Sequence, residues 1–121
     1  MTRLSRSPET TPVVVSCCRT AIGRSDAHHG VFRNVRGDEL AALVVSEAVA
    51  RGGVPPECIE DVLVGVTQQR AELGGNVART IAMLAGVPFG AAACTTNRQC
   101  GSSLQGLSQA CHSIMAGAED V

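Results

Sequence analysis

The residue best placed for chemistry is Cys100, within the stretch TTNRQCGSSLQGL. It stands between a candidate strand and an uncharged helical stretch. A thiol at a helix N-terminus faces the positive end of the macrodipole and unpaired backbone N–H groups, which favours the reactive thiolate. The same donors can stabilise an oxyanion when a thiolate attacks a carbonyl. The alternative for a single cysteine is an inert buried thiol, which is the interpretation we prefer for Cys94 and Cys111.

The composition excludes several other chemistries. All ten basic residues are Arg, so a Schiff-base lysine and a Walker phosphate loop are absent. Aromatic residues make up 2% of the chain and the net charge is −1, which argues against a nucleic-acid partner. The six cysteines contain no Cys-x-x-Cys spacing, so the sequence predicts no metal site.

The chain is predicted to be a globular cytoplasmic protein. It is 45% hydrophobic and 17% charged, typical of a packed domain. Residues 1–11 are polar and lack the apolar core of a signal peptide, so we expect a flexible tail and reduced thiols. Residues 99–118 carry no charge, but Ser, Gln, Gly and His interrupt them too often for a membrane span.

The elements that must position Cys100 follow a simple alternation. Hydrophobic periodicity predicts strands at 13–17, 62–66 and 91–96, each followed by a helix, at 39–51, 77–85 and 99–118. Asp38 and Asn76 are the expected N-caps of the first two helices. Strands that alternate with helices indicate an α/β fold with a parallel sheet and right-handed crossovers.

The last helix is the least ordinary of these elements. One face carries larger apolar residues and a second face carries small ones, with no charged face. We therefore expect a helix buried on most sides and packed by something larger than this chain. Three parallel strands would also leave apolar surface bare, so residues 12–121 are interpreted as part of a domain.

Several stretches in a fixed order resemble the thiolase family, over nearly all of residues 13–121. They read RTAIGR, GVFRNVRGDELAA, GVTQQRAELGGNVAR and NRQCGSSLQ. The likeness is greatest to 3-ketoacyl-CoA thiolases of bacterial fatty-acid β-oxidation, and the NRQCG context favours thiolases over ketoacyl synthases. The sequence departs from the family pattern at Thr96, at Ala21 and at the pair Cys17–Cys18.

The resemblance implies a thiolase-like α/β fold, of which residues 12–121 form an incomplete N-terminal domain with β-α-β-α-β-α order. It implies an acyltransferase that cleaves 3-ketoacyl-CoA with CoA to acetyl-CoA and a shortened acyl-CoA. Cys100 would be catalytic and carry the acyl group, with CoA as a substrate and no metal or cofactor. Implied partners are a second copy of the chain, contacted through Gln68–Arg79, and a β-oxidation multienzyme complex.

Other parts of the family's machinery are not found among these 121 residues. Thiolases supply a histidine from a Gly-His-Pro motif and a second cysteine from a Cys-x-Gly-Gly motif, and neither string occurs here. His112 would lie about 18 Å along the helix from Cys100, and His28 and His29 fall in a loop. The chain by itself is therefore expected to be inactive. The alternative is a non-catalytic, thiolase-derived fragment that acts as a binding or dimerisation module.

Two weaker candidates concern phosphate recognition. Gly74, Gly75 and Asn76 could hold a phosphate at a helix N-terminus, although a helix-start turn is the preferred interpretation. Four arginines could contact the acidic CoA nucleotide, although pairing with local carboxylates is preferred: Arg19, Arg24, Arg33 and Arg36. The sequence does not locate the substrate-binding residues.

Overall fold

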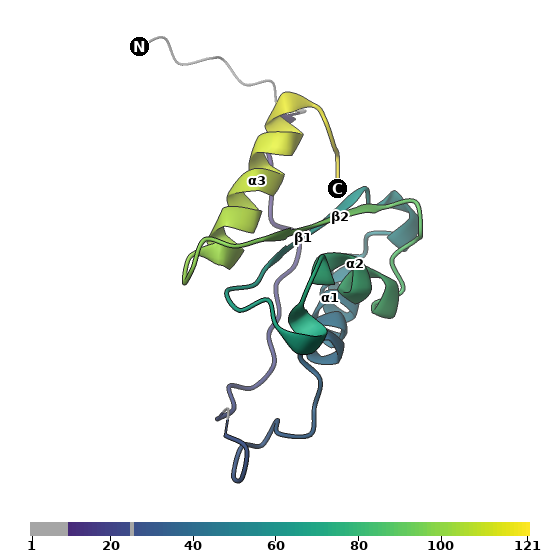
Figure 1. Cartoon of the computed structure of the whole chain (residues 1–121). Helices are drawn as coiled ribbons and strands as arrows, with labels where there is room; N and C mark the ends of the chain where they lie inside the picture. Colours follow the sequence, from purple (N-terminus) through teal and green to yellow (C-terminus); the bar gives the residue numbers. More distant parts are fainter. Residues whose placement is uncertain (1–9, 25) are drawn as a thin grey trace.

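The computed structural model describes residues 10–24 and 26–121. Its main elements, in chain order, are α1 (Gly37–Gly52), β1 (Asp61–Gly65), α2 (Val77–Leu84), β2 (Ala92–Thr96) and α3 (Ser102–Ala116), with short 3₁₀ turns η2 (Pro56–Cys58) and η3 (Ala71–Leu73) (Figure 1). Most of the tail predicted at 1–11 lies outside the described residues.

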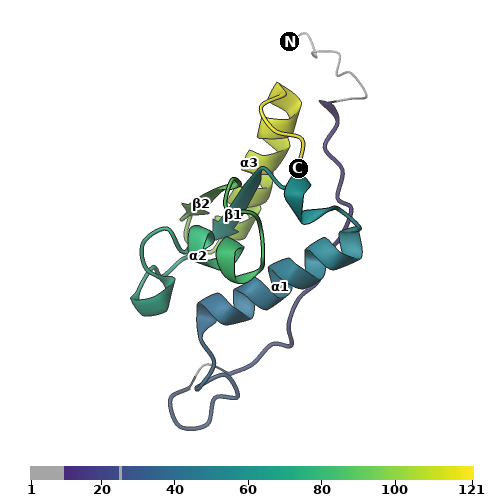
Figure 2. The same cartoon turned by 90° about the vertical axis from the view of Figure 1, so that its right-hand side faces the viewer.

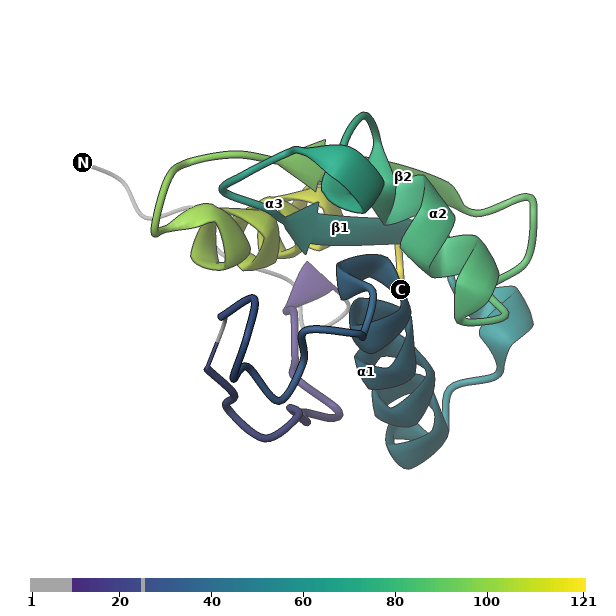
Figure 3. The same ribbon diagram turned by 60° about the horizontal axis from the view of Figure 1, so that its bottom comes forward.

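The two strands pair in parallel, as predicted, and form the middle of three layers. Their register aligns Asp61 with Ala92 and Gly65 with Thr96. Helix α3 lies on one side of the strands, whereas α2 covers the other side with α1 packed beside it (Figures 2 and 3). Both strands lie within one residue of their predicted positions, and together with α2 they hold the chain segments that lead to Cys100.

The strand predicted at 13–17 is wrong. Among the described residues the sheet contains β1 and β2 alone, and the run beginning at Val13 has no regular secondary structure. Val13, Val14 and Val15 are 73%, 74% and 64% exposed. A β-branched run becomes a strand only where a neighbouring strand pairs with its backbone groups, and no described strand does so here.

A small apolar core lies between the strands and the two helices that cover one face of them. One cluster joins Val62 of β1 to Ala82 of α2, together with Val87 and Ala91. A second cluster joins Ala42 of α1 to Val77 and Ile81 of α2. The segment that enters β2 is fixed by Arg79, which donates to the carbonyls of Phe89 at 2.7 Å and Ala91 at 2.5 Å and stacks over the Phe89 ring.

The N-cap of α1 differs from the predicted one, whereas the N-cap of α2 is Asn76, as predicted, but without a side-chain cap bond. Asp38 lies inside α1, and Arg36 precedes the helix without a side-chain cap. Asn76 does precede α2, but its side chain donates to the Ala93 carbonyl at 2.8 Å instead of capping the helix. The cap comes from the neighbouring strand, because the Ala78 N–H donates to Thr95 Oγ1 at 2.9 Å. A side chain distant in sequence therefore accepts from one of the backbone N–H groups that the first turn of α2 leaves without a partner within the helix.

Helix α3 contacts the strands through its small residues. Gly106 is buried, with the position of a Cβ lying 3.7 Å from Leu63, and Ser102 is 3% exposed. The larger apolar face is open, since Leu104 is 73% exposed and Leu107 is 51% exposed. Within the described residues the helix is thus buried along one face, and the partner expected on the other stays a prediction.

Candidate functional site: the turn that carries Cys100

Cys100 lies where the sequence places it, between the end of β2 and the start of α3. The helix begins at Ser102, with Gly101 as its N-cap, so the thiol precedes the first helical residue by two positions. Cys100 is exposed and unpaired with other cysteines. An approaching electrophile can therefore reach the sulfur from solvent.

The turn before Cys100 has an unusual backbone. Gln99 has φ of 51°, a left-handed conformation that is unfavourable for residues with a Cβ. Such conformations persist where the surroundings over-determine them. Here the Gln99 carbonyl accepts from Ser102 Oγ at 2.6 Å and from Thr67 Oγ1 at 3.0 Å. Asn97 adds a further restraint, because its Oδ1 accepts from the Gln99 N–H at 3.0 Å.

The first turn of α3 sits directly on the end of β1. A Cβ built on Gly65 would lie 2.3 Å from the backbone nitrogen of Ser103 and 2.4 Å from the carbonyl carbon of Ser102. Only a residue without a side chain permits this approach. Gly65 was not identified as a site residue from the sequence, although an isolated glycine within an apolar strand run is the signal of a close backbone approach.

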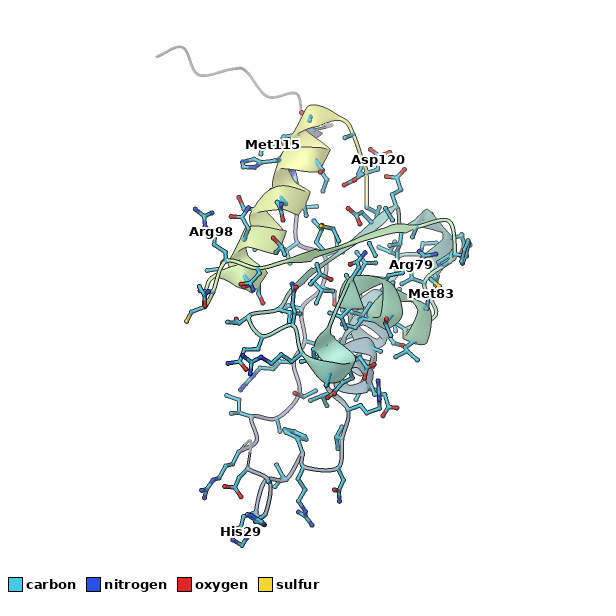
Figure 4. All side chains as sticks on the ribbon, in the orientation of Figure 1. His29, Arg79, Met83, Arg98, Met115 and Asp120 are labelled. Atoms are coloured by element: carbon cyan, nitrogen blue, oxygen red, sulfur yellow. The ribbon has the colours of Figure 1, made fainter. Side chains whose placement is uncertain are left out.

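The structure brings no histidine to Cys100 among the described residues. His29 lies at the tip of the 26–30 loop, far from Arg98, which is two residues before Cys100 (Figure 4). That loop is held by Asp26, whose Oδ1 accepts from the N–H groups of His28 and His29 at 3.0 and 2.7 Å. His112 is exposed on α3. Among the described residues, no histidine is therefore placed to act as a general base for Cys100.

The burial of the remaining thiols differs in part from what the sequence predicts. Cys94 is exposed on β2, so the prediction that it is a buried thiol is wrong, and Cys111 is half-buried. Side chains alternate between the faces of a strand, so Cys94 lies on the face opposite Thr95, which contacts α2. Helix α3 on that side packs chiefly against β1, which leaves Cys94 open to solvent. Cys18 donates to the Val44 carbonyl at 3.3 Å.

The four arginines considered for nucleotide recognition are engaged mostly in local contacts. Arg24 pairs with Asp26 at 3.4 Å, and Arg33 donates to the Gly30 carbonyl at 3.3 Å. Arg36 forms two bonds with the buried Asp38, at 3.0 and 2.7 Å. The hydrogen bond from Arg36 holds the pKa of Asp38 below its ordinary value. Pairing with local carboxylates, the preferred interpretation, is confirmed for two of the four.

The glycine pair before α2 forms a helix-start turn, as preferred. Gly75 has φ of 62°, and both polar atoms of the Asn76 side chain are occupied, since Oδ1 also accepts from the Thr95 hydroxyl at 2.8 Å. These two bonds tie the Asn76 side chain to β2, as expected of a structural turn at the start of the helix.

Metal-binding and membrane-spanning features are absent from the part of the chain that the structure describes. No group of three or more His, Cys, Asp or Glu side chains there is arranged to hold a metal ion. None of the described helices is both long enough and apolar enough to cross a membrane.

Comparison with known proteins extends the geometric description. The family model described as "Thiolase, N-terminal domain" matches residues 12–121. The 3-ketoacyl-CoA thiolase of Colwellia psychrerythraea is 47% identical over 110 residues, covering 90% of this chain and 28% of the relative. That of Shewanella frigidimarina is 48% identical over 109 residues, covering 89% and 28%.

A solved structure supports the same assignment. The acetyl-CoA acetyltransferase from Syntrophomonas wolfei superposes with a TM-score of 0.77 at 34% sequence identity, covering 88% of this chain and 26% of that one. The chain therefore spans little more than a quarter of the length of the relatives it matches. With a family match over residues 12–121 and an α/β fold shared with a solved relative, the chain belongs to the thiolase family through the N-terminal domain.

Proposed function

We propose that this chain contributes the nucleophilic cysteine of a 3-ketoacyl-CoA thiolase. The observation that carries the proposal is Cys100, exposed at the turn between β2 and α3, in a chain 47% identical to a 3-ketoacyl-CoA thiolase. The substrates are a 3-ketoacyl-CoA and free CoA, and the products are acetyl-CoA and a shortened acyl-CoA.

The chemistry assigned to Cys100 proceeds in two transfers. The sulfur attacks the 3-keto carbonyl carbon, the bond between C2 and C3 breaks, and acetyl-CoA leaves as an enolate that takes up a proton. The shortened acyl group is then a thioester on Cys100. The thiol of a second CoA attacks this thioester, forms the shortened acyl-CoA and returns the cysteine thiolate. The first attack needs a proton acceptor close to the sulfur.

The isolated chain is not expected to complete this cycle. His29 lies far from Arg98 in the turn before Cys100 (Figure 4), and His112 lies ten residues beyond the first residue of α3. General acid–base groups contribute about 10² to 10⁴-fold each. The activity therefore belongs to an assembled thiolase in which other residues provide proton transfer. A second copy of the chain, contacted through Gln68–Arg79, is a further proposed partner, and residues 68–72 of that segment are exposed.

A domain graft tests the assignment. Residues 12–121 would replace the matched segment of the Colwellia psychrerythraea relative, and CoA-dependent loss of 3-ketoacyl-CoA enolate absorbance would be followed. We expect turnover by the graft, none by the same graft carrying Cys100→Ser, and none by the isolated chain. A folded graft without activity, or activity that survives Cys100→Ser, would refute the proposal.

The rival is a non-catalytic binding or dimerisation module derived from a thiolase. It predicts an inactive graft that still assembles with the same subunit stoichiometry as the relative. Sedimentation of the graft beside the absorbance assay separates the two functions.

A further inference from the structure

We propose that Thr67 is a positioning residue for Cys100 and acts together with Ser102 through the carbonyl of Gln99. The inference rests on the proposed function for the role of the cysteine, but the contacts themselves are independent of it. Thr67 follows β1, whereas Gln99 follows β2, so the contact joins the ends of two strands.

The Gln99 carbonyl is held from three directions. It accepts from the Ser102 N–H at 3.1 Å, from Ser102 Oγ at 2.6 Å and from Thr67 Oγ1 at 3.0 Å. A carbonyl oxygen offers two lone pairs, so these donors saturate it. Because the peptide unit is planar, fixing this oxygen also fixes the N–H of Cys100 on the opposite side of the same plane.

Thr67 is tied to the turn a second time through its own backbone. Its carbonyl accepts from Asn97 Nδ2 at 3.0 Å, and Asn97 Oδ1 in turn accepts from the Gln99 N–H. The bonds of Thr67 and Asn97 thus brace the N–H and the C=O of Gln99, whose backbone is left-handed. If they are lost, Gln99 is free to return to negative φ, which rotates the Gln99–Cys100 peptide and moves the thiol away from the start of α3.

Thr67 is also a residue at which the side-chain bond to the Gln99 carbonyl can be removed without opening the core. Its side chain is exposed, whereas Ser102 is 3% exposed. Thr67→Val keeps the branched shape and removes the donor to Gln99. Thr67→Ser keeps the hydroxyl and loses a methyl group. Thr80, exposed on α2, offers a matched control through Thr80→Val.

The test measures iodoacetamide alkylation of the full chain under native conditions, with peptide mapping. Each rate at Cys100 is divided by the rate at Cys58, an exposed thiol on η2. We expect Thr67→Val to lower this ratio about three- to tenfold, because the loss of one hydrogen bond lowers the population of the native turn by about that factor. Thr67→Ser should restore the ratio, and Thr80→Val should leave it unchanged. Ser102→Ala should lower it in the same direction.

An unchanged or increased ratio in Thr67→Val, in protein with wild-type circular dichroism, would overturn the positioning role. So would a Thr67→Ser ratio as low as that of Thr67→Val. The activity of the domain graft separates this result from failure of the proposed function. An active graft with an unresponsive ratio overturns the positioning role alone, whereas a responsive ratio in an inactive graft upholds it and refutes the function.

Discussion

Replacing Gly65 with alanine should dislodge the helix that follows Cys100. The added Cβ would lie 2.3 Å from the Ser103 nitrogen and 2.6 Å from the Ser103 Cα, both backbone atoms that no rotamer change can move. Ordinary contact begins at 3.4 Å, so the first turn of α3 must retreat by roughly 1 Å. Overpacking against well-ordered structure costs about 1–3 kcal/mol, and the rigid backbone places this substitution near the upper figure.

An opposing effect reduces the net change. Alanine is favoured over glycine within a strand by about 0.5–1 kcal/mol, so we expect a net loss of about 2 kcal/mol in the free energy of unfolding. Urea titration followed by circular dichroism measures this loss as a lower midpoint at an unchanged slope. Alkylation of Cys100 should change in the same variant, because the retreat of α3 moves the turn that precedes it.

Two glycines serve as matched controls. A Cβ on Gly90 meets nothing within 4 Å, and a Cβ on Gly106 meets Leu63 at an ordinary 3.7 Å. Gly90→Ala should alter stability by less than about 0.5 kcal/mol, whereas Gly106→Ala should stabilise α3 by up to about 1 kcal/mol. The reasoning fails if Gly65→Ala unfolds at the same urea concentration as Gly90→Ala.

Three further predictions concern charge, capping and association. Because Arg36 lowers the pKa of Asp38 in the folded chain, this carboxylate stabilises the fold above its unfolded pKa of about 3.9. The contribution disappears as pH falls through the folded pKa. Asp38→Asn should therefore flatten the acid side of the curve of unfolding free energy against pH, and a curve parallel to that of the wild type would contradict this. Thr95→Val removes the acceptor for the Ala78 N–H and should cost about 1 kcal/mol in urea titration, whereas Thr95→Ser should retain most of the stability; equal losses would exclude the capping role. The chain should self-associate in sedimentation because Leu104 and Leu107 are exposed, and Leu104→Glu should shift it towards monomer. A monomeric wild type would show that these exposed leucines do not drive association.

The features that follow from local pattern were predictable from the sequence. Strands β1 and β2 and the helix after Cys100 are signalled by short apolar runs, helical periodicity and terminal glycines, and each lies close to its predicted residues. The family is also recognisable from the sequence alone, because several separated motifs occur in the right order, and the family match over residues 12–121 confirms it. These signals all come from residues that are neighbours in the chain.

Most of the features that failed depend on partners distant in the chain. Asp38 is the exception: it is a residue type typical of an N-cap, yet it lies within α1 and pairs with Arg36, two residues before it. The cap of α2 comes from Thr95, seventeen residues away from the N–H that it accepts. The run at 13–17 has the composition of a strand but has no strand beside it among the described residues. Composition describes what a segment can form, whereas pairing decides what it does form.

The location of Cys100 follows from the parallel pairing of the two strands. Because Gly65 lies opposite Thr96, the residues that follow β1 emerge beside those that follow β2, at the carboxyl edge where ligands of open α/β sheets bind. Thr67 is thereby brought within 3.0 Å of the Gln99 carbonyl, and Gly65 allows α3 to start directly above the strand. Cys100, the proposed nucleophile, and the residues that support its turn thus lie at two strand ends and one helix start. A proton acceptor for the proposed reaction need not belong to this unit, since the thiol is exposed and lies outside the core that the chain builds for itself.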